Sequence, residues 1–201
     1  MASFAKPRHL LLLLPVAVIV ALSLAAAADA RRRQVHLRLY MHDILDGPEQ
    51  TAIRLIRNAG PPHEFQKGEC FGDTMAIDDP ITESPGIIGS GSGPVVGRAQ
   101  GTYMLSSQRE NVLVVAVTVA LTDGPYSGST FTVAGRVEIY DDAAEVAVVG
   151  GTGQFRRAAG HVVWRTSKLV SKVYVVVELI VDMSVPANDT AAPGSGSLAF
   201  E

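Results

Sequence analysis

Apolar and polar residues alternate along most of this chain, and the alternation has a period of two. It is clearest between residues 129 and 140, where Phe131, Val133 and Val137 share one face and threonines and charged residues share the other. A period of two is typical of a β-strand with one buried face, whereas an amphipathic helix repeats about every 3.6 residues. Helical periodicity is almost absent, so the pattern predicts an all-β domain.

Eight segments carry the strand pattern. They are Val35–Asp43, Phe71–Ile77, Val95–Ser107, Val112–Thr122, Ser129–Tyr140, Ala144–Val149, His161–Ser167 and Lys172–Met183. Strands of this number and length, joined by short turns, form either a sandwich or a closed antiparallel barrel. A closed eight-stranded barrel has no exposed edge, and its interior is just wide enough for a small ligand.

The connections between these strands are polar or rich in glycine and proline. Residues 48–67 are expected to form a loop with a short turn at 51–56. A turn is the simpler interpretation of Asp78-Asp79-Pro80, and a paired-carboxylate site is the alternative. Residues 84–94, rich in glycine and serine, are expected to form a slack connection, with a lid as the alternative.

The first 30 residues are predicted to be a signal peptide. A basic start precedes an apolar run from Leu10 to Leu24, and small residues suited to cleavage follow it. A membrane anchor that is retained is the alternative interpretation of the run. We therefore expect a secreted protein that has no membrane association after cleavage.

The remaining chain divides into a β-domain at residues 31–184 and a tail at residues 185–201. The tail is rich in proline, alanine, glycine and serine, a composition that predicts disorder. Asn188 begins an Asn-Asp-Thr sequence, which is an N-glycosylation acceptor in secreted proteins.

Charge and cysteine content exclude several classes of function. The 201 residues carry 17 basic and 20 acidic side chains, a formal net charge of −3, so nucleic acid is not an expected partner. Cys70 is the only cysteine and no intrachain disulfide can form, so the fold depends on burial, hydrogen bonds or oligomerisation. We find no motif for a metal or a cofactor and predict neither.

The glycine cluster Val148–Gly153 invites a nucleotide-binding interpretation, which the surrounding sequence does not support. A dinucleotide site needs a third glycine and a following helix, but Arg156 stands near that position and the residues from His161 resemble a strand. We predict a tight turn that needs a positive φ at glycine.

Two side chains stand out as candidates for chemistry. Asp43 has the same parity as the apolar residues of the first strand, so it is expected to project inward, where burial would raise its pKa and suit it to acid–base work. A cap on the turn that follows is the alternative. Tyr103 lies beyond the small residues Ala99 and Gly101, which leave space for a ligand beside its hydroxyl. Residues 112–122 are apolar on both faces, which hints at a subunit interface.

Several runs together resemble the plant dirigent family and occur in family order over residues 35–184. They are Tyr40–Leu45 (YMHDIL), Phe71–Thr74 (FGDT), Ile77–Thr82 (IDDPIT), Val96–Gly101 (VGRAQG), Gly128–Phe131 (GSTF) and Val148–Arg156 (VVGGTGQFR). The resemblance implies an eight-stranded antiparallel barrel of the dirigent and allene-oxide-cyclase type. It also implies a homotrimer secreted to the apoplast of the plant cell wall.

The resemblance also implies a function. Dirigent proteins have no oxidising centre: a laccase or peroxidase makes phenoxy radicals, and the dirigent protein steers their stereoselective coupling, as with coniferyl alcohol. Phenylpropanoid, lignan or lignin metabolism and plant defence are the implied settings. The physical content is that a pocket presents one face of each reactant.

By position, Asp43 matches the family's acid and Tyr103 its pocket tyrosine, with inward-facing Val133 and Val137 as further substrate contacts. Lignan-forming relatives carry an acid and an arginine where this chain has Val137 and Ala144, so a less charged pocket is expected and lignan formation stays open. A cyclase or dehydratase acting on a closed-shell phenolic is one alternative function. A non-catalytic cell-wall or defence binding module is the other.

Overall fold

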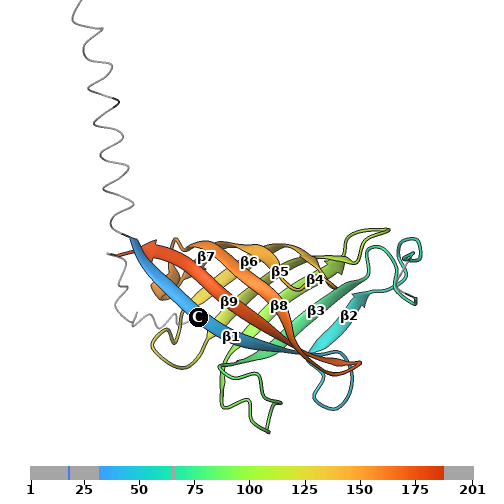
Figure 1. Cartoon of the computed structure of the whole chain (residues 1–201), viewed down its shortest axis with the longest axis horizontal. Coiled ribbons are helices and arrows are strands. Elements are labelled where there is room, and N and C mark those ends of the chain that lie inside the picture. The colour runs from blue at the N-terminus through green and yellow to red at the C-terminus, as the bar shows by residue number, and fades with distance from the viewer. Residues whose placement is uncertain (1–17, 19–31, 65–66, 188–201) are drawn as a thin grey trace, which may run out of the picture.

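Figure 1 shows the computed structural model, which describes residues 18, 32–64 and 67–187. These residues form β1 (Arg32–Ile44), β2 (Ala52–Ile56), β3 (Thr74–Thr82), β4 (Val95–Leu105), β5 (Val112–Leu121), β6 (Thr130–Glu138), β7 (Ala144–Thr152), the 3₁₀ turn η1 (Gly153–Phe155), β8 (Ala159–Ser171) and β9 (Tyr174–Pro186). β9 continues two residues past the predicted domain end. The predicted signal peptide and Asn188 lie outside the described residues. No helix in the described part of the chain is long and apolar enough to cross a bilayer.

The sheet closes on itself, which confirms the predicted eight-stranded antiparallel barrel. β1 pairs with β9 along its whole length, and the strands then follow in the order β9, β8, β7, β6, β5, β4 and β3. Two residue pairs between β1 and β3 complete the circle, Tyr40 with Thr82 and Met41 with Ile81. We call this short contact the closure seam. In Figure 1, β2 extends from the end of the barrel where β1 ends.

β2 is a ninth strand among the described residues, where the sequence predicted only a loop with a short turn. It pairs with the first residues of β3, from Ala52 opposite Ile77 to Ile56 opposite Thr74. Ala52 is fully buried, whereas Ile53 and Leu55 are 54% and 56% exposed. With apolar residues on its exposed positions, the segment lacks the alternation that identifies a half-buried strand.

The predicted turn at Asp78-Asp79-Pro80 is wrong, because β3 runs straight through these residues and pairs with β4 throughout. Proline is tolerated here because of the partner change on the other side of β3. The Asp78 N–H bonds the Thr51 carbonyl at 2.9 Å beside β2, while β1 begins to pair only at Ile81. Pro80 falls in the gap between the two partners, where no ladder donor is needed.

One half of the barrel interior is filled solid. Aromatic and aliphatic side chains of the half where β1 begins and β9 ends have an exposed fraction of 1% or less: Val35, Val119, Phe131, Phe155, Val162, Val181 and Met183. Phe131 and Phe155 meet edge to face, with ring centroids 5.8 Å apart. The cavity described below lies in the opposite half.

Only the end of the glycine cluster forms the tight turn that the sequence predicted, because residues 148–152 belong to β7 and the turn begins at Gly153. Gly153 has φ = +60°, and a Cβ there would lie 2.7 Å from the Ser129 hydroxyl oxygen. That oxygen accepts a hydrogen bond from the Gln154 N–H at 3.0 Å, which fixes the start of η1. The strand expected after it is β8.

Residues 83–94 are anchored at the outside of the barrel and are not simply slack. His42 lies on the outward face of β1, yet it is completely buried. The Thr82 hydroxyl donates to the Ser84 carbonyl at 2.8 Å and so accepts from His42 Nε2, also at 2.8 Å. His42 Nδ1 then accepts from the Tyr174 hydroxyl, whose oxygen accepts from the Ile88 N–H. Burial lowers the pKa of His42 to about 4, so it stays neutral.

The filled half predicts a large cost for truncating an aromatic ring. Phe155→Ala removes a fully buried side chain in contact with Phe131 and Tyr126, and should lower the free energy of unfolding by about 3–5 kcal/mol. Urea denaturation of the purified variant measures it. Tyr140→Ala, at a side chain 74% exposed, is the control and should stay within about 0.5 kcal/mol of the parent. Equal stability of the two variants would contradict a solid half-barrel.

Candidate functional site

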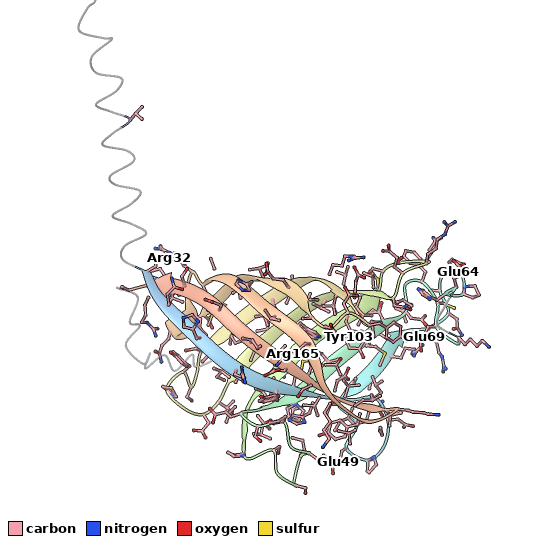
Figure 2. All side chains as sticks on the ribbon, viewed as in Figure 1. Arg32, Glu49, Glu64, Glu69, Tyr103 and Arg165 are labelled. Atoms are coloured by element: carbon pink, nitrogen blue, oxygen red, sulfur yellow. The ribbon has the colours of Figure 1, made fainter. Side chains whose placement is uncertain are left out.

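A cavity of about 390 Å³ occupies the half of the barrel that side chains do not fill. Its size falls within the range of small-molecule sites in proteins. Strands β1, β3, β4, β5, β6, β8 and β9 contribute its inner wall: Met41, Asp43, Met75, Tyr103, Leu105, Leu113, Val115, Val137, Trp164, Val175 and Val177. Figure 2 shows Tyr103, Arg165 and Glu69, all at this cavity, away from Arg32 at the filled end.

Asp43 projects into the cavity, as its parity in the sequence predicted. The Tyr103 hydroxyl, from β4, donates to Asp43 Oδ2 at 3.2 Å. The structure therefore brings together the two residues that the sequence selected separately. The rest of the inner wall is apolar, so this pair is the polar centre of that wall.

Burial dominates the electrostatics of the pair. Loss of hydration raises the pKa of Asp43 to about 6, against the weaker effect of the Tyr103 hydrogen bond, which lowers it. Burial and the nearby Asp43 carboxylate raise the pKa of Tyr103, which stays protonated as a donor. At neutral pH the site offers an ionisable carboxyl close to its midpoint and a neutral phenol.

Asp79 is a further buried carboxyl beside the pair that the sequence analysis assigned to a turn. It has no exposed surface, and its Oδ1 accepts a hydrogen bond from the Thr51 hydroxyl at 2.6 Å. Burial first, and then the Asp43 charge, raise the pKa of Asp79 to about 8. The inward parity of Ile77 and Ile81 was the signal that would have found it, once Pro80 is allowed within a strand.

Arg54 of β2 brings a fixed positive charge to the mouth of the cavity. Its guanidinium donates to Asp73 Oδ2 at 2.9 Å and to Glu69 Oε1 at 2.8 Å. Burial acts to raise the pKa of Asp73, but N–H groups of Cys70 and Asn58 and the Arg54 charge outweigh it and hold the pKa below its usual range. This cluster was not predicted from the sequence, because residues 52–56 were expected to lie in a loop.

The expectation of a less charged pocket holds for the inner wall but not for the rim. Val137 lines the cavity as predicted, whereas Ala144 packs against the apolar core. Glu138, which parity assigned to the outside, reaches the rim together with Asp141 and Arg165. The charges therefore surround the opening and leave the interior apolar.

Val133 does not line the cavity. It is 1% exposed and belongs to the packed core, one inward position deeper along β6 than Gly135. Among the described residues, no group of three or more His, Cys, Asp or Glu side chains is arranged to hold a metal ion.

Comparison with known proteins identifies relatives over most of the β-domain. The family model described as "Dirigent-like protein" matches residues 34–184. Dirigent protein 1 of Arabidopsis thaliana is 36% identical over 141 residues, which are 70% of this chain and 74% of that protein. Pterocarpan synthase 1 of Glycine max is 39% identical over 127 residues, which are 63% of this chain and 64% of that protein.

Solved structures agree with the sequence relatives. The pterocarpan synthase dirigent protein GePTS1 superposes with a TM-score of 0.70 and 30% identity, covering 84% of this chain and 94% of that one. The pterocarpan synthase dirigent protein PsPTS1 gives a TM-score of 0.65 and 32% identity over 76% and 94% of the two chains.

The hydrogen bond between Tyr103 and Asp43 can be tested by its effect on the carboxyl. Tyr103→Phe removes a donor that favours the ionised form, so the pKa of Asp43 should rise above about 6. Carboxyl ¹³C NMR of the aspartate-labelled protein across a pH titration measures it. Tyr140→Phe alters an exposed tyrosine and should leave the titration unchanged. An Asp43 pKa that stays constant in Tyr103→Phe would mean that the bond does not form.

Proposed function

The chain belongs to the dirigent-like protein family, and on this basis we propose that its cavity binds a phenolic molecule and fixes the stereochemistry of a bond formed on it. The observation that carries the proposal is the Asp43–Tyr103 pair, hydrogen-bonded in a cavity whose inner wall is otherwise apolar. The apolar wall suits an aromatic ring, the tyrosine hydroxyl suits a phenolic oxygen, and the carboxyl suits proton movement.

We propose coupling of phenoxy radicals, of the coniferyl alcohol type, as the reaction. A separate oxidase, a laccase or peroxidase, supplies the radicals, and two of them join by a carbon–carbon bond to give a quinone methide. A hydroxyl oxygen then attacks the methide carbon, its O–H proton passes to Asp43, and the quinone oxygen gains a proton from water at the mouth. The cavity wall decides which face of each partner is presented.

Modest energies are enough for this role. A difference of about 2 kcal/mol between two competing orientations gives a product ratio of about 30 to 1. An apolar pocket distinguishes orientations by about this amount through shape alone. The chain therefore needs no strong binding to bias the product.

The setting of the reaction is part of the proposal. Secretion to the apoplast would bring the protein to wall-localised oxidases, and Asn188 would be available there for glycosylation. A homotrimer is supported by the outer face of β5, where Val114 is 45% exposed in the single chain and Ala116 is also exposed. Buried in an assembly, this apolar face would contribute to stability.

A second candidate is cyclisation or dehydration of a closed-shell phenolic without any oxidant. It is favoured by the similarity to two pterocarpan synthase structures and by the raised pKa of Asp43, which lets the carboxyl act as an acid near neutral pH. In that reaction protonated Asp43 gives its proton to a leaving hydroxyl, which departs as water, while the phenolic O–H gives its proton to water at the mouth and a quinone methide remains. An internal hydroxyl then attacks the methide carbon to close a ring, its proton returns to the Asp43 carboxylate, and the quinone oxygen regains a proton from water.

Chiral chromatography of coupled products tests the first reaction. Coniferyl alcohol and a one-electron oxidant alone should give racemic product, and adding the protein should give one enantiomer in excess. Asp43→Asn keeps the shape of the side chain but removes the base, and should slow trapping of the quinone methide by about 100-fold. Asp123→Asn, an exposed change in the loop beyond the filled end, is the control and should behave as the parent. Racemic product with the parent protein would overturn the proposal.

The dependence on pH separates the two reactions. Trapping needs ionised Asp43, so its rate should be full above the pKa of about 6 and fall as the pH drops through it. Dehydration needs protonated Asp43, so its rate should fall as the pH rises through the same value. Stopped-flow absorbance of the quinone methide in the first case, and turnover of a 4-hydroxybenzyl alcohol derivative without oxidant in the second, give the two profiles.

A further inference from the structure

We propose that Asp79 is a positioning residue that shares one proton with Asp43, donating it to the Asp43 carboxylate from behind while the reactants occupy the cavity side. Asp79 is absent from the cavity wall, so it acts through Asp43 and does not touch the phenolic molecule. The catalytic consequence of this inference rests on the proposed function, whereas the geometry and the titration of the two carboxyls are independent of it.

Continuing the register of the closure seam by two residues places the two carboxyls on facing positions, and the Asp43 charge acts on Asp79. In the closure seam Met41 is paired with Ile81 in an antiparallel ladder. Two residues further along β1 is Asp43 and two residues back along β3 is Asp79, and both keep the inward parity of that pair. On its other side Asp79 pairs with Ala99, whose small, fully buried side chain leaves the carboxyls room.

Two carboxyl oxygens at this point lack partners. Asp43 Oδ2 accepts from Tyr103 and Asp79 Oδ1 accepts from Thr51. Asp43 Oδ1 and Asp79 Oδ2 are both buried and have no hydrogen-bond partner among the described residues. A buried carboxyl oxygen without a partner is costly, and a single proton held between the two acids would satisfy both.

The surrounding charges favour one proton on the pair. Burial raises the pKa of both acids, and the Asp43 charge raises that of Asp79 further. The other charged groups that act on Asp79 are Arg98, which lowers its pKa, and Asp78, which raises it. These two bond each other on the exposed face of the sheet, at 2.8 Å, and so largely cancel. Neutral donors, Thr51 and Tyr103, occupy the remaining sides of the pair.

Sharing a proton changes what Asp43 can do. Two close carboxyls resist carrying two negative charges, so one ionises and the other stays a neutral acid. With Asp79 as the neutral acid, Asp43 is ionised near neutral pH despite its burial and can take the proton of an attacking hydroxyl. The pair then holds two protons and returns one to water at the mouth, which restores the starting state.

Titration of the two carboxyls tests the inference without any substrate. In aspartate-labelled parent protein, ¹³C NMR should show two buried carboxyls that lose their protons in separate steps, near the values of about 6 and about 8. Asp79→Asn should remove the upper step. Asp43→Asn should move the upper step downward, because the repelling charge is gone. Asp123→Asn should leave both steps in place.

The titration step near pH 8 decides whether the two carboxyls share a proton. If it stays at the same pH in Asp43→Asn, or if both carboxyls titrate together near the ordinary range of aspartate, the shared proton is refuted. Asp79→Leu keeps the volume but cannot hold a proton, and Asp79→Asn keeps a donor. With coniferyl alcohol and oxidant, Asp79→Asn should keep a trapping step supported by ionised Asp43, whereas Asp79→Leu should shift its pH midpoint upward.

A fold effect and a failed function are both distinguishable from these outcomes. Urea denaturation of each variant shows whether Asp79→Leu is folded, and Asp79→Asn decides alone if it is not. Two separate steps combined with racemic coupling product would sustain the shared proton and overturn the proposed function. Loss of the two separate steps combined with stereoselective product would refute the shared proton and sustain the proposed function.

Discussion

The structure depends on a closure seam only two residue pairs long. β1 and β3 meet at Tyr40–Thr82 and Met41–Ile81 and then separate, while every other neighbouring pair of barrel strands has a longer ladder. The first and last strands of a closed barrel are staggered, so they pair over only part of their length. Here β1 and β3 stop pairing at the boundary between the filled half and the cavity. Beside the seam, β1 keeps its pairing with β9 and β3 keeps its pairing with β4, but β1 and β3 no longer pair with each other. On β3, this stretch pairs with β2 and contains Pro80. On β1, it contains Asp43.

The same seam accounts for the chemistry of the site. A carboxyl inside a fully packed barrel would lose its hydration with nothing in return, whereas Asp43 lies at a boundary with a donor on one side and open volume on the other. Its pKa is raised by burial but kept within reach of neutral pH by the Tyr103 hydrogen bond. The charged groups that need water, such as Arg54 and Glu138, are arranged around the rim. Charged side chains thus lie at the rim and apolar side chains line most of the inner wall.

Sequence predicted the strands and much of the site because both follow from parity, whereas the family resemblance was what favoured a barrel over a sandwich. Alternation identified the long strands, and the position of Asp43 among inward apolar residues identified its direction. Residues 52–56 and 78–80 were misassigned for one physical reason: tertiary pairing decides their conformation against the local signal. Pro80 breaks a strand in isolation but not in a gap between partners, and Ile53 and Leu55 are exposed on an edge. Asp79 was hidden by the same error. Val133 kept its inward parity, but parity gives no depth along the barrel axis.

The packed half of the barrel, which includes Phe131 and Phe155, closes the interior on one side of the cavity. A guest cannot pass through this half and has to use the charged rim. Under the proposed coupling reaction, two reactants would therefore load in sequence, with the first one held deep and the second nearer the rim. If that reaction takes place, the larger coupled product has to leave before the next pair can enter, so the proposed function implies inhibition by accumulated product.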